Sequence, residues 1–179
     1  CQKENNIVDK LETLLKSVVK QQIVADVPVG TFLSGGVDSS TIAALMQSQS
    51  NIPINTFTIG FNEEIYNEAI QAKLIANHLR TNHNELYITP QQALDVIPDL
   101  PSIYCEPFAD SSQIPTFLLS KLAREKVTVA LSGDAGDELF GGYNRYALTK
   151  EFWGKLSNVP FWARSFLSSA ITSLSPNAW

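Results

Sequence analysis

Short β-branched and aromatic runs alternate with stretches of helical periodicity along this chain, and that alternation limits the possible folds more than any other feature. The runs that predict strands cover residues 29–33, 54–61, 85–88 and 127–131. Apolar positions recur at helical spacing over residues 9–24, 41–49, 67–80, 91–97 and 115–125. Strands separated by helices pair in parallel. The sequence therefore predicts an α/β fold with a parallel sheet and helices on both faces.

Composition narrows the class of protein. The 179 residues are 44% hydrophobic, enough to bury a core. The net charge of −5 disfavours a general nucleic-acid binder, which needs a basic surface. Two cysteines cannot form a disulfide framework and fit a reducing, cytoplasmic setting. The longest uncharged stretch, residues 39–62, is interrupted by polar residues, so no membrane segment is predicted.

Two loops rich in glycine, serine and aspartate follow the first and fourth predicted strands. They cover residues 34–40 and 132–142. Ligands of open parallel sheets bind at the carboxyl ends of the strands, near the point where the strand order reverses. These loops are therefore the predicted ligand site.

The first loop reads Ser34-Gly35-Gly36-Val37-Asp38-Ser39-Ser40. Glycines allow close approach of the backbone, hydroxyls donate hydrogen bonds, and the amides of a following helix face an anion, so this loop suits a polyphosphate. It lacks the lysine and the GxxxxGK[ST] spacing of a P-loop. Asp38 would repel phosphate unless a cation bridged them, which makes it a candidate Mg²⁺ ligand. The alternative is an ordinary glycine turn with a helix cap.

The second loop contains three acidic residues within five positions. It reads Ser132-Gly133-Asp134-Ala135-Gly136-Asp137-Glu138. These carboxylates would repel one another, and a metal ion or a shifted pKa would relieve that repulsion. The alternative is a solvated acidic loop that caps a helix beginning near Leu139.

Both loops resemble those of a known family. The first resembles the PP-loop, the SGGxDSS pyrophosphate-binding signature of the N-type ATP pyrophosphatases. Residues 131–143 are similar to the matching loop of the glutamine-hydrolysing asparagine synthetases, as are residues 26–30, 57–61 and 106–112. The PP-loop alone indicates a superfamily, whereas five stretches in this order are specific to the family. The resemblance covers about Leu11 to Tyr146 and implies an adenine nucleotide alpha hydrolase-like fold.

The resemblance also implies a reaction and its residues. ATP activates a carboxylate as an acyl-adenylate with release of pyrophosphate, and ammonia then displaces AMP. Aspartate would be the carboxylate, and a glutaminase domain would supply the ammonia. By this resemblance the pyrophosphate lies on Ser34, Gly35, Gly36, Ser39 and Ser40; Mg²⁺ lies on Asp38 and Asp137; and AMP lies against Phe32, Ile59, Ser132 and Gly133.

The chain departs from the family pattern at three places. Asp134, the expected base for ammonia, stands where well-studied members have glutamate, so a shifted loop or a different nucleophile is implied. Ala135 replaces a common glycine, which is tolerable if its φ is negative and strained otherwise. Residues 110–113 lack an arginine that pairs with the substrate carboxylate in some members. Arg145 and Lys150 are possible substitutes, or ordinary solvated helix charges.

We expect residues 1–179 to be a single synthetase (ATP pyrophosphatase) domain, truncated at both ends, without the N-terminal glutaminase domain and inactive alone. A complete domain is the alternative. Expected ligands are ATP, Mg²⁺ and a carboxylate substrate. We expect no nucleic acid or membrane partner, and a homodimer is left open. Other functions left open are amidation or cyclisation of a different carboxylate (a sugar acid, a β-lactam or a peptide precursor) and a nucleotide-binding module without turnover.

Overall fold

The structure is a computed structural model that describes residues 2–62, 67–107 and 109–173. Its residues form two compact units, Cys1–Asp134 and Ala135–Trp179, which are described separately below. Phe108, part of the predicted 106–112 stretch, lies outside the described residues. The expectation of one domain over residues 1–179 stays a prediction.

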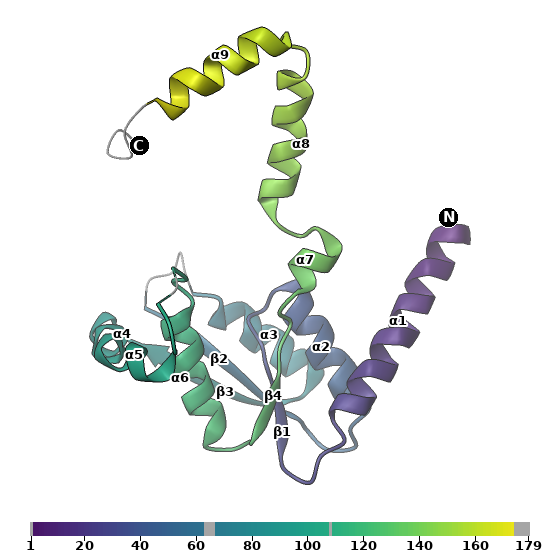
Figure 1. Cartoon of the computed structure of the whole chain (residues 1–179). Coiled ribbons are helices and arrows are strands. Elements are labelled where there is room, and N and C mark those ends of the chain that lie inside the picture. Colours follow the sequence, from purple (N-terminus) through teal and green to yellow (C-terminus); the bar gives the residue numbers. More distant parts are fainter. Residues whose placement is uncertain (1, 63–66, 108, 174–179) are drawn as a thin grey trace. The chain divides into compact units, whose positions relative to one another are not determined.

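Four parallel strands form the sheet of the first unit, in the order β3-β2-β1-β4 (Figure 1). Their bounds are Val29–Phe32 for β1, Asn55–Phe61 for β2, Asn82–Ile88 for β3 and Val129–Leu131 for β4. The chain moves outward from β1 to β3, then returns to place β4 on the other side of β1. The strand order thus reverses between β1 and β4, and both predicted loops follow these two strands.

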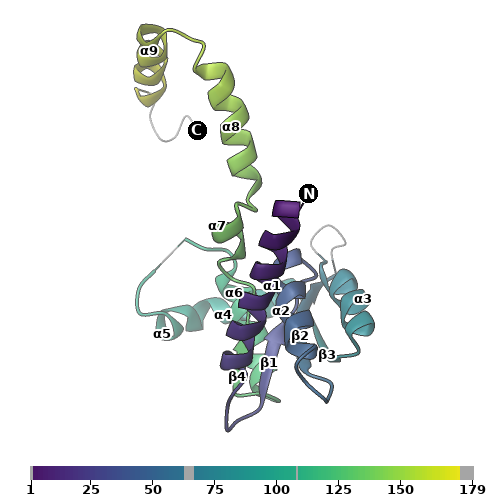
Figure 2. The same cartoon turned by 90° about the vertical axis from the view of Figure 1, so that its right-hand side faces the viewer.

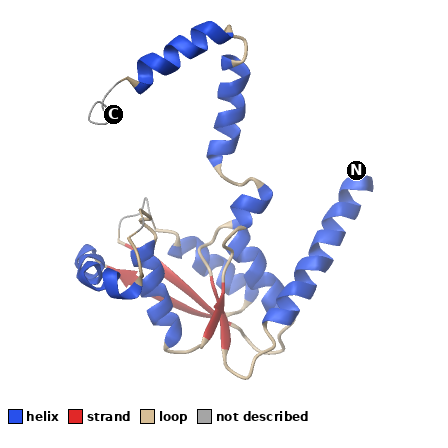
Figure 3. Ribbon diagram, in the orientation of Figure 1, coloured by secondary structure: helices blue, strands red, loops and turns tan. Residues whose placement is uncertain are grey.

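Helices cover both faces of this sheet, as predicted (Figures 2 and 3). One face packs against α1 (Gln2–Gln22), α2 (Val37–Gln47) and α3 (Ala69–Leu79), and the other against α6 (Gln113–Arg124). Three short helices precede α6: α4 (Pro90–Val96), η2 (Ile97–Asp99) and α5 (Leu100–Ile103). Alternation along β2 divides the core, because Phe57 packs on Ala123 and Val127 whereas Ile54 packs on Val19 and Leu45.

Three helices begin at least three residues before the predicted position. One is α1, predicted from residue 9 and observed from Gln2. The other two corrections concern the site. We predicted helices from residue 41 and from near Leu139, but α2 begins at Val37 and α7 (Gly136–Phe140) at Gly136. Serine and aspartate have low helix propensity in isolation, yet their side chains stabilise first turns. The Ser40 hydroxyl and amide both donate to the Gly36 carbonyl, at 2.6 and 3.1 Å. Acidic residues of both loops therefore lie in helical first turns.

A hydrogen-bonded polar group lies between the sheet and α3. The Thr56 hydroxyl lies 2.8 Å from His83 Nδ1 and 2.9 Å from the Thr81 hydroxyl. His83 Nε2 is buried and has no partner among the described residues. Burial therefore lowers the pKa of His83 below its ordinary value, although the nearby Glu85 carboxylate opposes this. Glu85 itself pairs with Lys73 at 2.8 Å.

We expect this histidine to make the fold sensitive to acid. Because its pKa is lower in the folded state than the ordinary 6.5, the unfolded state binds more protons between the two values. The free energy of unfolding should therefore fall as the pH falls from neutral through 6.5 towards the lowered pKa of the folded state. His83→Gln should flatten this dependence in urea unfolding curves. His78→Gln, at the exposed end of α3, is the matched control, since these are the two histidines of the chain. Equal slopes in all three proteins would contradict the prediction.

The second unit consists of α7, α8 (Asn144–Leu156) and α9 (Phe161–Thr172). None of its described residues, 135–173, is buried. Five aromatic side chains on α8 and α9 are 59–77% exposed: Phe152, Trp153, Phe161, Trp162 and Phe166. The described part of this unit therefore has no apolar core of its own. Within the described ranges of the whole chain, no helix is long and apolar enough to cross a membrane.

Candidate functional site

The first loop is held closed by its own hydroxyl groups. Ser34 Oγ lies 2.9 Å from Ser39 Oγ, and the Ser34 amide donates to the same Ser39 oxygen at 3.1 Å. The Gly36 amide donates to Ser34 Oγ at 3.3 Å. The loop is therefore fastened to the first turn of α2, which fixes its backbone before any ligand binds.

Gly35 meets two demands that other residues cannot meet together. Its φ is +88°, a left-handed conformation that favours glycine. A Cβ at this position would also lie 3.0 Å from the Ala72 amide nitrogen and 3.0 Å from Gln71 Cβ. The loop thus passes directly over the start of α3.

The start of α2 offers amides and a carboxylate together. No side chain caps this helix, and Gly36 at its N-cap is exposed. Asp38 lies half-buried in the first turn. Within the described ranges no cluster of three or more histidine, cysteine, aspartate or glutamate residues could hold a metal. A helix start with one carboxylate nevertheless fits Mg²⁺ that arrives with phosphate, since Mg²⁺ takes one or two protein carboxylates and fills its shell with phosphate oxygens and water.

The second loop packs backbone to backbone against the first. A Cβ on Gly133 would lie 2.6 Å from the Ser39 amide nitrogen and 2.9 Å from the Asp38 carbonyl carbon, so only glycine permits this approach. The Thr31 hydroxyl donates to the Leu131 carbonyl at 3.1 Å and ties β1 to β4 just before the loops begin. Two segments far apart in the sequence therefore form one surface.

Asp134 is positioned by Ser132. The Ser132 hydroxyl donates to the Asp134 carboxylate at 3.0 Å, and it accepts from the Asp134 amide at 3.4 Å. This positioning contact was missed in the sequence, where Ser132 was assigned only to AMP. The Ser-x-Asp spacing is the signal that could have found it, because serine bonds the backbone two residues ahead in a local turn.

The remaining predicted residues divide between the two units. Phe32 of β1 and Ile59 of β2 are half-buried. Phe32 packs in the α6 cluster with Phe57, and Ile59, two residues after Phe57 in the same strand, points to the same face of the sheet. Asp137 belongs to the second unit, where its carboxylate lies against Gly142 and its carbonyl accepts from the Gly142 amide at 3.0 Å. The first unit therefore contains every predicted site residue except Asp137.

Ala135 is strained. Its φ of +70° and ψ of 0° are left-handed. Alanine would be tolerated here only with a negative φ, so this backbone conformation is strained. We expect Ala135→Gly to raise the free energy of unfolding by up to about 1 kcal/mol, because alanine pays about that much in this conformation. Urea unfolding measures the gain. Gly141→Ala is the matched control with the opposite sign, since Gly141 has a φ of +69°. A destabilised Ala135→Gly variant would contradict the prediction.

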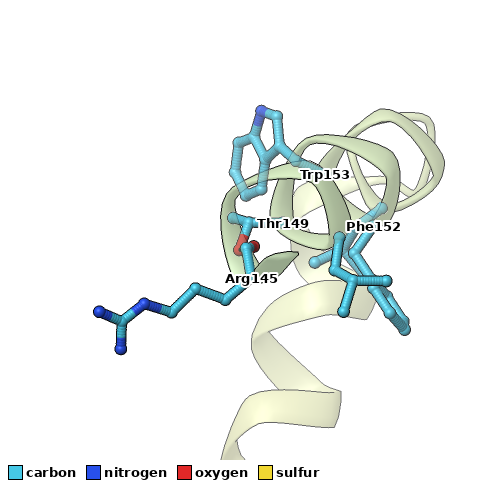
Figure 4. Close-up of a pocket in the computed structure, with 6 residues that line it drawn as sticks. Arg145, Thr149, Phe152 and Trp153 are labelled. Carbon is cyan, nitrogen blue, oxygen red and sulfur yellow. The ribbon is translucent and has the colours of Figure 1, made fainter. Parts of the chain in front are cut away.

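The two candidate cations of the second unit differ in what holds them. The Arg145 guanidinium lies 4.1 Å from the centre of the Tyr143 ring, and the Tyr143 hydroxyl donates to Glu138. This hydrogen bond lowers the pKa of Glu138. Among the described residues, no hydrogen bond, ion pair or ring contact holds Lys150. Figure 4 shows Arg145 pointing away from Phe152 and Trp153, which line a shallow apolar pocket on α8. The residues that line this pocket include no acidic residue, unlike the two loops, each of which contains aspartate.

The segment before α6 presents a carboxylate where the sequence resemblance implies an arginine in some members. Asp110 accepts a hydrogen bond from the Ser112 amide at 2.8 Å. This bond lowers the pKa of Asp110, so the group is ionised at neutral pH. Residues 109–113 therefore carry negative charge.

Comparisons with known proteins identify the family of the chain. The Asparagine synthase family model matches residues 10–177. Asparagine synthetase [glutamine-hydrolyzing] 1 of Bacillus subtilis is 36% identical over 143 residues, covering 80% of this chain and 22% of that protein. Asparagine synthetase B of Escherichia coli is 35% identical over 160 residues, covering 78% and 28% respectively. The chain thus spans about a quarter of the length of these relatives.

A solved structure shares the fold. The NH3-dependent NAD synthetase of Campylobacter jejuni superposes with a TM-score of 0.53 over 76% of this chain and 60% of that chain, at 15% identity. This likeness confirms the adenine nucleotide alpha hydrolase-like α/β fold, and the family model, which spans nearly the whole sequence, fixes the family. The chain belongs to the asparagine synthase family.

Proposed function

We propose that this chain is the nucleotide-binding part of a synthetase that amidates a carboxylate at the expense of ATP, with aspartate as the carboxylate. The observation that carries the proposal is the contact of Gly133 with Ser39, which joins the two loops at the reversal of the strand order. Ligands of open α/β sheets bind there. The names of the Bacillus subtilis and Escherichia coli relatives support the reaction class.

The first loop would bind the leaving pyrophosphate. A carboxylate oxygen of the substrate attacks the α-phosphorus, the bond from this phosphorus to the bridging oxygen breaks, and pyrophosphate departs with the electron pair. Backbone amides of Gly35 and Gly36 and the hydroxyls of Ser34, Ser39 and Ser40 would hold its oxygens. Phosphoryl chemistry of this kind is accelerated mainly by positioning and by neutralising charge. A preformed loop supplies the positioning.

Mg²⁺ would neutralise charge on the phosphates when bound. Asp38 is the ligand that the first unit offers, and Asp137 is the second ligand that the family resemblance implies. Phe32, Ile59, Ser132 and Gly133 would line the AMP portion.

Asp134 would act on the second half of the reaction. Ammonia attacks the acyl carbon, the bond to AMP breaks, and a proton must leave the nitrogen. The Ser132 hydroxyl holds the Asp134 carboxylate at 3.0 Å, so this carboxylate is directed and accessible. The ammonia would come from glutamine hydrolysed in a glutaminase domain, and the isolated chain is expected to bind nucleotide without efficient turnover.

Calorimetric titration of ATP into this chain, with Mg²⁺ and with EDTA, tests the proposal. We expect binding that depends on Mg²⁺. A chain that is folded by circular dichroism and binds ATP under neither condition would contradict the proposal. Release of AMP and pyrophosphate on adding aspartate and ammonia then tests the chemistry.

A second candidate is amidation or cyclisation of a different carboxylate. Residues 109–113 favour it, because Asp110 is negative where an arginine would pair with the carboxylate of aspartate. A screen of carboxylates for AMP release separates the two functions. Turnover with aspartate alone would exclude this candidate.

A further inference from the structure

The side chain of Gln71 covers the glycine turn of the first loop. A Cβ on Gly35 would lie 3.0 Å from Gln71 Cβ and 3.1 Å from Gln71 Cγ. The amide carbon is bonded directly to Cγ. The amide group of Gln71 is therefore within reach of the loop backbone, on the α3 side of Gly35.

Small side chains fix α3 in this place. Ala43 of α2 and Ala72 and Ala76 of α3 are fully buried in one cluster with Leu33, the residue that enters the loop. Alanines at a helix contact allow the two backbones to approach closely. Figure 2 shows α2 and α3 close together, and the two helices are in contact. The position of Gln71 over Gly35 is thus set by a rigid core contact.

The Gln71 amide is free to bind a ligand. The side chain is exposed, and no hydrogen bond from it is found within the residues that the structure describes. A glutamine amide can donate two hydrogen bonds. The loop itself, residues 34–40, contains no lysine or arginine. A neutral amide beside it would therefore add a hydrogen-bond donor for phosphate where the loop has no cationic side chain.

We propose that Gln71 is a further binding residue of this site, whose side-chain amide donates to the phosphoanhydride group held by the first loop. The inference rests on the proposed function, since that function supplies the anion. By this inference α3 contributes to binding of the polyphosphate and not to binding of the nucleoside.

Two substitutions separate hydrogen bonding from packing. Gln71→Met keeps the stem that covers Gly35 and removes the amide; Gln71→Glu keeps the shape and adds negative charge. Gln71 is the third residue of α3, where glutamate stabilises a helix, so a loss with Gln71→Glu does not arise from unfolding. Asn77→Asp, an exposed charge change near the other end of α3, is the matched control.

The probes are ATP, inorganic pyrophosphate and AMP, each titrated with Mg²⁺. We expect Gln71→Met to weaken ATP and pyrophosphate about tenfold and Gln71→Glu to weaken them more, with AMP unchanged and Asn77→Asp like the wild type. Wild-type affinity for ATP in Gln71→Met would overturn the inference, and so would an equal loss for AMP. Failure of the folded wild-type chain to bind all three probes would instead contradict the proposed function.

Discussion

Substitution of Gly133 by alanine is expected to abolish ATP binding at concentrations that saturate the wild type. The added methyl group would lie 2.6 Å from the Ser39 amide nitrogen and 3.0 Å from Ser39 Cα. Both atoms belong to the backbone, so no side-chain rotation can relieve this clash. The second loop must move away from α2, which separates Ser132 and Asp134 from the first loop. The same collision displaces Ser39, a proposed phosphate ligand, and loss of the Ser39 and Ser132 hydrogen bonds to the nucleotide weakens binding by about a hundredfold or more.

The fold is expected to survive this substitution with a smaller loss. Overpacking of one methyl group costs about 1–3 kcal/mol, measured as a lower urea midpoint. Gly154→Ala is the matched control, because nothing lies within 4 Å of the position where its Cβ would stand. Gly154 is inside α8, so its substitution should stabilise the helix by about 1 kcal/mol and leave ATP binding unchanged. Wild-type ATP affinity in Gly133→Ala would show that the contact does not shape the site.

The alternation of strands and helices could be predicted because each element carries its own periodicity. β2 and α3 were placed within two residues of their observed bounds. The start of β3 at Asn82 was missed, since Asn82, His83 and Asn84 lack the apolar alternation of a half-buried strand. Pairing with β2 along its whole length decides that boundary, and such pairing is a tertiary effect.

The meeting of the two loops at one edge of the sheet could be predicted, but the contacts between them could not. A parallel sheet places the ends of all strands at one edge, and the loop compositions pointed to β1 and β4. That these two strands are neighbours depends on the strand order, which the sequence does not state. The contact of Gly133 with Ser39 follows from that neighbourhood, whereas the left-handed φ of Ala135 is a property of the folded backbone. Both need three-dimensional packing to be seen.

Substitution of Asp38 by asparagine is expected to change the Mg²⁺ dependence of ATP binding rather than the fold. Asparagine preserves size in the first turn of α2 and removes the charge, at a cost in helix stability of about 0.3–1 kcal/mol. With Mg²⁺ we expect ATP to bind at least about tenfold more weakly. Substitution of residues that only support a metal ligand already weakens metal binding by about tenfold or more, and loss of the ligand itself should cost at least as much. In EDTA we expect equal or tighter binding, because the carboxylate no longer repels phosphate.

A loss of ATP affinity that occurs with Mg²⁺ but not in EDTA identifies a metal ligand. A residue that only supports the loop would lose ATP affinity equally with Mg²⁺ and with EDTA when substituted. Asp26→Asn, an exposed carboxylate change before β1, is the matched control and should bind ATP like the wild type in both conditions. An equal loss in Asp38→Asn with and without Mg²⁺ would assign Asp38 to the structure of the loop. The polyphosphate would then have to be neutralised by cations other than a Mg²⁺ ion bound to Asp38.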